Sequence, residues 1–180
     1  MDRQPTLEGE KVLLRPLRPE DWGALWAIGS DPELWAMHPS HDRWQEPVFR
    51  DFFEDALAKG GALAIIDKES AAVIGSSRFQ DHDPAAGGVV EIGWSFLSRT
   101  YWGRGYNAAF KQLMLEHAFR SVSRVLFRVG AENMISRRAM EKIGGALTGE
   151  TFTEVRAGRP VDHVVYEITR ESFAARPLVR

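Results

Sequence analysis

Residues 89–117 read VVEIGWSFLSRTYWGRGYNAAFKQLMLEH, and this stretch decides the architecture of the protein. Residues 89–97 are rich in β-branched and aromatic side chains, which is typical of a strand. Residues 105–120 place apolar side chains at helical spacing, which predicts a long helix. A second apolar run, VLFRVG, follows at residues 125–130. A strand, a helix and a strand in this order predict a β-α-β unit with a parallel strand pair.

The rest of the chain adds strands and helices on both sides of this unit. We expect further strands over residues 11–18, 62–67 and 72–80, and two within 146–169 around a turn at 157–160. We expect helices from residue 19, over 47–59 and after Asn133, with a loop or broken helix over 30–44. Three successive strands favour hairpins, so the predicted fold class is α+β with a mixed sheet rather than a doubly wound parallel one.

The loop between the predicted strand and helix, residues 99–107, has the chemistry of an anion site. Gly103 and Gly105 let the backbone approach a ligand closely. The unpaired amides at the start of the helix lie at the positive end of its dipole, and Arg99 and Arg104 add charge. These features favour a phosphate or pyrophosphate. The alternative is a tight turn that needs two glycines and binds no ligand.

The loop is neither a P-loop, since no Gly-Lys-Ser/Thr follows, nor a dinucleotide fingerprint, since Ala108 stands at the third glycine position. Together, residues 91–97 (EIGWSFL), 101–107 (YWGRGYN) and 133–144 (NMISRRAMEKIG) resemble the GNAT acetyltransferase superfamily, and within it the RimJ/RimL-type N-acetyltransferases. The resemblance extends from residues 13–21 (LLRPLRPED) to the last strands. It implies one N-acetyltransferase domain over residues 1–180, a GNAT-like central mixed, splayed β-sheet flanked by helices on both faces, and acetyl-CoA as the donor.

The resemblance also implies which residues bind acetyl-CoA. The family's pyrophosphate loop corresponds here to Trp102, Gly103, Arg104, Gly105, Tyr106 and Asn107. Trp102 is similar to the residue of the RimJ/RimL branch, whereas Asn107 replaces a small residue. On the preceding strand, the backbone of Phe96 and Leu97 is expected to pair with the pantetheine arm as an added strand would. Asn133 is expected to contact the coenzyme.

Acetyl transfer to an amine requires a group that takes the amine's proton. The chain has no cysteine, which excludes a Cys acyl-enzyme and leaves direct attack by the amine as the simplest route. The resemblance points to Glu91 as the general base, because several family members use an acidic residue on this strand through a water molecule. The alternative is a structural carboxylate that pairs with an arginine of a neighbouring strand, such as Arg78.

The departing thiolate needs a proton or a hydrogen-bond donor. Many family members have a tyrosine where this chain has Met140, which cannot donate a proton. Ser136 lies one turn earlier on the same helix face. Asn133 and Ser136 match the Asn-x-x-Ser pattern of the RimL branch, which implies that Ser136 acts at the sulfur, by protonating it or by hydrogen-bonding it while water supplies the proton. The alternative is a helix cap followed by an ordinary first-turn serine.

The acceptor pocket is expected, by resemblance, between the early helices and the last strands. Trp35, His38 and Trp44 lie in irregular sequence and are the expected acceptor-binding residues. Candidates for the opposite wall are Phe152, His163 and Tyr166. Residues expected in the core instead, from their helical spacing, are Phe49, Phe52 and Phe53. The histidines lack metal-ligand spacing with supporting carboxylates, so no metal is expected.

The formal net charge of −2 hides a division along the chain. Residues 1–97 contain 9 basic and 17 acidic residues, whereas residues 98–143 contain 9 basic and 3 acidic ones. The basic segment contains the predicted pyrophosphate loop. The acidic segment contains Glu91 and the helices expected near the acceptor, where an acidic field would attract a cationic amine.

The protein is expected to be cytoplasmic and not to bind a membrane. No apolar run approaches the roughly 18 residues of a membrane span, and the polar, acidic start is unlike a signal peptide. The expected partners are acetyl-CoA and an amine, either a protein or peptide N-terminus or a small amine, with no nucleic acid; the resemblance allows a homodimer. The competing function is a catalytically weak acyl-CoA-binding module, which Met140 and Asn107 suggest.

Overall fold

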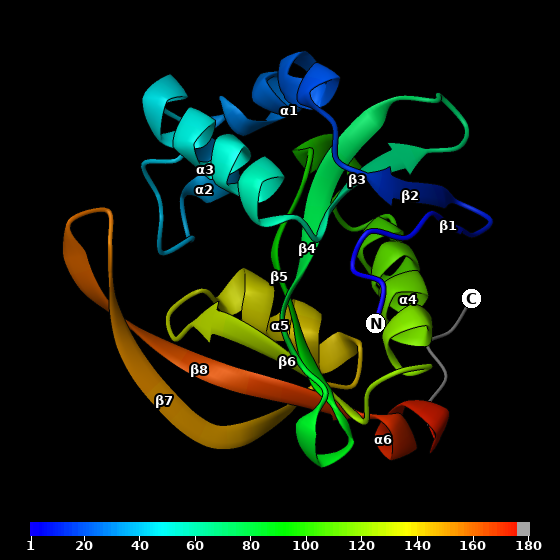
Figure 1. Ribbon diagram of the computed structural model, residues 1–180. Coiled ribbons are helices and arrows are strands. Elements are labelled where there is room, and N and C mark those ends of the chain that lie inside the picture. The colour runs from blue at the N-terminus through cyan, green and yellow to red at the C-terminus, as the bar shows by residue number, and fades with distance from the viewer. Residues whose placement is uncertain (176–180) are drawn as a thin grey trace.

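An eight-stranded sheet forms the centre of the computed structural model, which describes residues 1–175 (Figure 1). The strand order is β1-β2-β3-β4-β5-β6-β8-β7. The strands are β1 (Leu7–Glu8), β2 (Val12–Pro16), β3 (Ala62–Asp67), β4 (Val73–Asp83), β5 (Val89–Leu97), β6 (Arg124–Gly130), β7 (Ala146–Arg156) and β8 (Arg159–Thr169). Only β5 and β6 pair in parallel among these described strands. The predicted α+β class, mixed sheet and β-α-β unit are confirmed.

Helices cover both faces of the sheet. The helices are α1 (Trp22–Gly29), α2 (Pro32–Trp35), α3 (Glu46–Lys59), α4 (Tyr106–Ala118), α5 (Met134–Lys142) and α6 (Arg170–Ala175). Strand β3 shows the division, because its side chains alternate between two cores. Leu63 and Ile65 join the core beneath α4 and α5, while Ala62 and Ala64 join the one beneath α1, α2 and α3. Each core therefore buries one helical layer against one sheet face.

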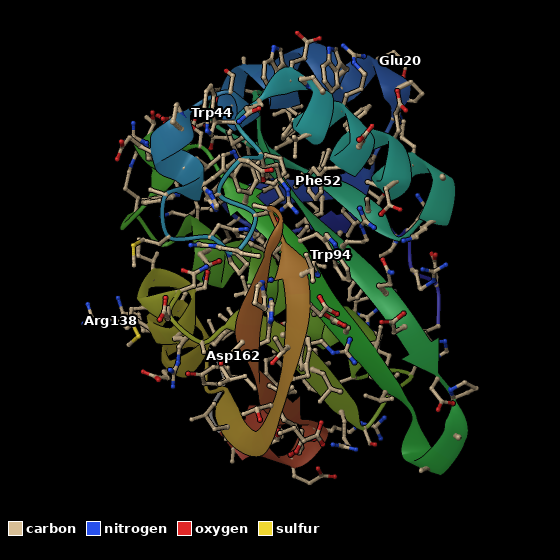
Figure 2. The ribbon with its side chains drawn as sticks, turned by 90° about the vertical axis from the view of Figure 1, so that its left-hand side faces the viewer. Glu20, Trp44, Phe52, Trp94, Arg138 and Asp162 are labelled. Atoms are coloured by element: carbon tan, nitrogen blue, oxygen red, sulfur yellow. The ribbon has the colours of Figure 1, made fainter. Side chains whose placement is uncertain are left out.

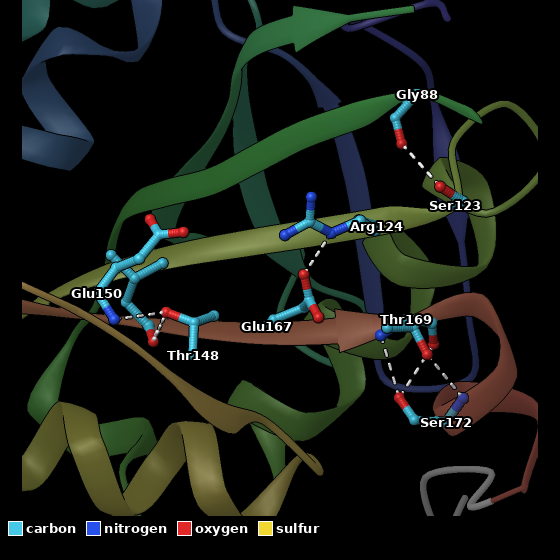
Figure 3. A network of polar contacts seen from close by, with 9 residues as sticks. Gly88, Ser123, Arg124, Thr148, Glu150, Glu167, Thr169 and Ser172 are labelled. Atoms are coloured by element: carbon cyan, nitrogen blue, oxygen red, sulfur yellow. Dashed lines mark hydrogen bonds and ion pairs between the residues drawn. The ribbon is translucent and has the colours of Figure 1, made fainter. Parts of the chain in front are cut away.

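Two short elements, β1 and α6, have no counterpart among the predicted elements. Strand β1 has only two residues, too few to show a pattern. Helix α6 begins with a reciprocal cap, in which the Thr169 amide donates to Ser172 Oγ and the Ser172 amide donates to Thr169 Oγ1 (Figure 3). Helix α6 follows the C-terminal end of β8, and near this end Arg124 of β6 pairs with Glu167 of β8 (Figure 3).

The β7–β8 hairpin extends the sheet toward the helices of the N-terminal half. Its two strands are eleven residues each, and β7 is exposed along most of its length. The hairpin curves so that its tip reaches the loop before α3 (Figures 1 and 2). The hairpin, that loop and β5 therefore surround a common space.

Candidate active site

Strands β5 and β6 separate partway along their length. Their parallel pairing covers only Val89–Glu91, while β5 pairs with β4 as far as Leu97. Two residues of β5, Trp94 and Ser95, lie opposite the single Ser77 of β4, and Trp94 has a φ of 52°. A bulge of this kind bends a strand and increases its twist. The β6-facing edge of β5 beyond Glu91 is therefore free to pair with an extended ligand.

The loop after β5 ends in a helix N-terminus with unpaired amides. Gly103 and Gly105 have φ values of 69° and 82°, in the left-handed region that glycine tolerates best. Gly105 is the N-cap of α4, and no side chain caps this end. Lys11 Nζ donates to the Arg104 carbonyl over 2.7 Å and thereby supports the loop. The first-turn amides of α4 are left for an anion.

A cavity of about 550 Å³ joins the free edge of β5 to this helix terminus. Predicted coenzyme residues that line it are Phe96, Leu97, Trp102, Gly103, Gly105, Asn107 and Asn133. Arg138 and Lys142 of α5 line it as well and add positive charge. An extended arm with a pyrophosphate at one end fits this combination of free strand edge, free amides and basic side chains.

Three of the predicted coenzyme residues make contacts within the protein. The Tyr106 side chain is buried and donates from Oη to Asp67 Oδ1 over 3.0 Å, so only its backbone faces the loop. The Arg104 side chain does not line the cavity and lies over Tyr101 and Tyr106. The Leu97 carbonyl already accepts a hydrogen bond from Trp102 Nε1 over 3.0 Å. These groups hold the loop in shape.

A second cavity, of about 760 Å³, lies between β5, β6 and the β7–β8 hairpin. We call it the acceptor cavity, and the first one the coenzyme cavity. The residues that line both are His38, Ser95, Asn107, Asn133, Ser136 and Ala139. The two cavities therefore meet at a junction beside the bulge of β5, and a group that enters from one side can reach a group from the other.

Glu91 lines the acceptor cavity and is held in an ion pair. Its carboxylate is 5% exposed and pairs with Arg128 of β6, which also contacts Asp81 over 3.3 Å. The alternative expected for Glu91, a carboxylate paired with an arginine of a neighbouring strand, is what the structure shows, but the arginine is Arg128 and not Arg78, which pairs with Asp55 over 2.9 Å. Glu91 thus faces the acceptor cavity with a cation beside it.

Asn133 and Ser136 lie at the junction. Asn133 Oδ1 accepts a hydrogen bond from the Ser136 amide over 3.2 Å, which confirms the predicted helix cap. The cap uses the Ser136 backbone only, so the Ser136 hydroxyl stays available to the cavities. Met140 is buried, and its side chain lines the acceptor cavity.

Lys111 is a site residue that the sequence interpretation missed. Its Nζ donates to Ser95 Oγ over 2.6 Å, and Ser95 Oγ in turn lies 2.8 Å from Ser77 Oγ. The amine lies over the rings of Phe110 and Phe127 and is closed off from solvent. Burial lowers the pKa of the Lys111 ammonium to about 7, because no ion-pair partner offsets the lost hydration within the part of the chain described. The signal in the sequence was a lysine directly after the apolar Phe110 of the predicted helix.

Of the three predicted acceptor-binding residues, only His38 lines the cavities. His38 lies at the junction, where burial and the nearby Arg43 hold its pKa well below the usual value. Trp35 does not line either cavity; it is 2% exposed in the core, and its Nε1 donates to the Gly29 carbonyl. Trp44 is 41% exposed and lies outside both cavities (Figure 2). The acceptor roles of Trp35 and Trp44 are not supported by these positions.

The aromatic residues expected in the core or on the far wall fall into two groups. Phe49 and Phe53 are buried in the core under α3, as predicted, and Phe52 packs against that core. Phe152 and His163 stack with ring centroids 4.9 Å apart and line the acceptor cavity. Tyr166 is buried, and its hydroxyl bonds to Arg137 and Glu141 outside the cavity.

Among residues 1–175, no group of three or more His, Cys, Asp or Glu side chains is arranged to hold a metal ion. Over the same range, no helix combines the length and apolar character needed to cross a membrane.

Comparisons with known proteins agree with this architecture. Uncharacterized N-acetyltransferase p20 of Bacillus licheniformis is 28% identical over 177 residues, which cover 94% of this chain and 98% of p20. A GCN5-related N-acetyltransferase from Brucella melitensis has a TM-score of 0.83 at 25% identity, covering 96% of this chain and 81% of that one. RimJ of Mycobacterium smegmatis, solved in complex with CoA-disulfide, has a TM-score of 0.74 at 20% identity, covering 95% and 94%.

The family assignment comes from the match to a family model. The model of the acetyltransferase (GNAT) domain matches residues 11–146, which include the coenzyme cavity's loop, strand β5 and helices α4 and α5. The splayed strand pair and the uncapped helix terminus lie inside this range. The chain therefore belongs to the GNAT acetyltransferase family, whose members take an acetyl group from acetyl-CoA.

Proposed function

We propose that this enzyme is a RimJ/RimL-like N-acetyltransferase that transfers the acetyl group directly to a primary amine, either a protein or peptide N-terminus or a small amine. The observation that supports the proposal is the junction of the two cavities at Ser95, Asn107 and Ser136. Acetyl-CoA supplies a reactive thioester carbonyl when it is bound. The chain supplies two entrances, so donor and acceptor approach each other from opposite sides.

The residues of the coenzyme cavity bind and orient the donor. The free edge of β5 offers backbone groups to the pantetheine arm, as a sheet edge does for an added strand. The first-turn amides of α4 bind the pyrophosphate, and Arg138 and Lys142 add charge at the same end. Asn133 holds the first turn of α5 at the junction.

We propose Glu91 as the base that takes the amine's proton through water. Replacing it with glutamine should lower kcat about 100-fold, because general-base catalysis contributes effects of that order. The acetyl-CoA Kd should change less than about twofold, since Glu91 does not line the coenzyme cavity. The measurement is kcat against pH by release of free thiol. Glu167→Gln breaks a similar ion pair elsewhere in the sheet and is the control. An unchanged pH–rate profile in Glu91→Gln would remove Glu91 as the base.

Ser136 is proposed to donate to the departing thiolate. Ser136→Ala should lower kcat about tenfold, the effect of losing one hydrogen bond made mainly in the transition state. The helix cap survives, because it uses the Ser136 amide. Thermal unfolding should therefore be nearly unchanged while steady-state turnover falls. A variant with wild-type kcat would show that water alone serves the sulfur.

A direct assay separates the proposed enzyme from a coenzyme-binding module. The full chain is incubated with acetyl-CoA and a panel of peptide N-termini, small amines and aminoglycosides, and free thiol is recorded. Calorimetry with acetyl-CoA measures coenzyme binding independently. Acetylation of at least one amine supports the proposal. Coenzyme binding without turnover on any amine would favour the weak module that Met140 and Asn107 suggest.

A further inference from the structure

Arg43 is a buried guanidinium at the wall of the acceptor cavity. It belongs to the loop between α2 and α3 and is 7% exposed. Its guanidinium carbon lies 4.2 Å from the ring centroid of Phe52 and 5.1 Å from that of Trp35. The planar guanidinium therefore packs against two aromatic rings, and its N–H groups remain available to a ligand in the cavity.

Arg43 lacks a carboxylate partner within the described part of the chain. None of the ion pairs and side-chain hydrogen bonds among residues 1–175 includes its guanidinium. Three carboxylates of the cavity wall are paired with other arginines: Glu91 and Asp81 with Arg128, and Glu154 with Arg156. Glu150, on the same wall, and Asp42, whose charge acts on Arg43 from the next position in the chain, form no ion pair with it. A buried charge without a partner is costly, so such a group is expected to meet its counter-ion in a ligand.

Other cations surround this part of the cavity. Burial, with the nearby Arg156 as the second cause, lowers the pKa of Arg43 to about 9. Arg78 lies 6.0 Å from the same Phe52 ring and 4.9 Å from the Trp94 ring, and its Nε and Nη2 have no hydrogen-bond partner. The tip of the β7–β8 hairpin brings Arg156 to the wall of the cavity, which Arg43 and Trp94 also line. Arg78 and Arg156 each have a carboxylate partner, Asp55 and Glu154, whereas Arg43 has none among the described residues, so Arg43 is the cation here that is expected to pair with an anionic ligand.

We propose that the acceptor is an amine that also carries a carboxylate, an amino acid or a compound of that type, and that Arg43 binds the carboxylate. This inference rests on the proposed function, because it names the acceptor of the same cavity. A guanidinium presents parallel N–H donors that match the two oxygens of a carboxylate. The aromatic lining, with Trp94 on β5, Phe127 on β6 and Phe152 on the hairpin, suits an apolar side chain between the two ends. The amine end then faces the junction at Ser95 and Ser136.

The test measures binding without requiring turnover. N-acetylglycine, N-acetyl-L-leucine and N-acetyl-L-phenylalanine, with the corresponding amides, are titrated calorimetrically into the full enzyme. At least one acid should bind about tenfold more tightly than its amide, and Arg43→Gln should reduce that ratio below about threefold. The ratio in Arg43→Lys should be intermediate, because lysine keeps the positive charge but lacks the two parallel N–H donors of the guanidinium. Arg50→Gln, an exposed arginine stacked on Trp22, is the control. Acids that all bind no better than their amides would overturn the proposal.

A second assay distinguishes failure of this inference from failure of the proposed function. L-phenylalanine and phenethylamine differ only in the carboxylate and are compared as acceptors by thiol release. Acetylation of both with equal kcat/KM, unchanged in Arg43→Gln, would leave the N-acetyltransferase standing and reject the carboxylate site. Arg43-dependent binding of the acids without acetylation of any amine would do the reverse. Should Arg43→Gln fail to fold, Arg43→Lys carries the same comparison.

Discussion

Gly105→Val should weaken acetyl-CoA binding by at least about tenfold, which corresponds to about 1.4 kcal/mol. Gly105 caps α4 with a φ of 82°, and a β-branched residue in this region costs on the order of 1–2 kcal/mol or more. The variant relieves that strain by shifting the loop, which moves the first-turn amides of α4 away from the pyrophosphate. Calorimetric titration with acetyl-CoA measures the loss.

The matched control is Gly60→Val. Gly60 ends α3 with a φ of 70° and a ψ of −176°, a conformation essentially restricted to glycine, and lies outside both cavities, so the variant carries at least as much backbone strain away from the coenzyme. It should lose stability and keep the wild-type Kd for acetyl-CoA. Gly105→Ala is a milder version that answers the question should the valine variant fail to fold. Wild-type affinity in both Gly105 variants would show that the loop does not bind the coenzyme.

Lys111→Met should make the enzyme more stable below neutral pH and nearly inactive. The wild-type folded state releases the Lys111 proton at a pKa of about 7, whereas an exposed lysine has a pKa of 10.5. Between these values the unfolded chain binds more protons, so wild-type stability rises with pH across this window. Below pH 7 the buried ammonium costs the folded state on the order of 3–5 kcal/mol, and methionine removes that cost.

The measurement is the free energy of unfolding from urea titrations between pH 6 and pH 10.5. The difference between Lys111→Met and wild type should be largest at pH 6 and should fall toward zero at the alkaline end. Lys68→Met, which removes an exposed lysine, is the control and should show no such slope. A wild-type stability that stays flat from pH 7 to 10 would mean that Lys111 keeps its ordinary pKa in the folded protein.

Activity should fall in Lys111→Met because the amine organises the junction. Lys111 donates to Ser95, which lines both cavities, so its loss leaves the Ser95 hydroxyl with only Ser77 and the Gly93 carbonyl as partners among the described residues. We expect kcat to decrease about 100-fold, the range for a group that moves or positions a proton. The acetyl-CoA Kd should remain within about threefold of the wild-type value, since Lys111 does not line the coenzyme cavity. Full activity would exclude a role for this amine.

The parts of the fold that depend on local sequence were predicted well. Strands β3 and β5 have the predicted bounds. Helices α3 and α5 begin within one residue of their own predicted first residues. Asn133 caps α5 as expected, because an N-cap needs only a side-chain oxygen and the amides of the next turn. Strand β1 and helix α6 were missed because they are too short to show a period.

The site was predicted less completely, because side chains meet there from distant parts of the chain. Trp35, Trp44 and His38 all come from the stretch without a regular sequence pattern, over residues 30–44. Of these three residues, only His38 lines the cavities. In the sequence, Arg43 and Lys111 are single charged residues and belong to no motif that predicts a site. Their significance arises from burial against Phe52, Phe127 and other residues far away in the sequence.

The sequence by itself determined the order of the elements, the two-glycine loop before α4 and the exclusion of a cysteine nucleophile. Each of these depends on residues close together in the chain or on composition alone. Only the tertiary structure decided that β5 leaves β6 after Glu91, that two cavities meet at Ser95, and that Lys111 and Arg43 are charges enclosed by apolar groups. The physical reason is that cavity shape and the solvation of a charge depend on all the groups packed around a point, whatever their distance along the chain.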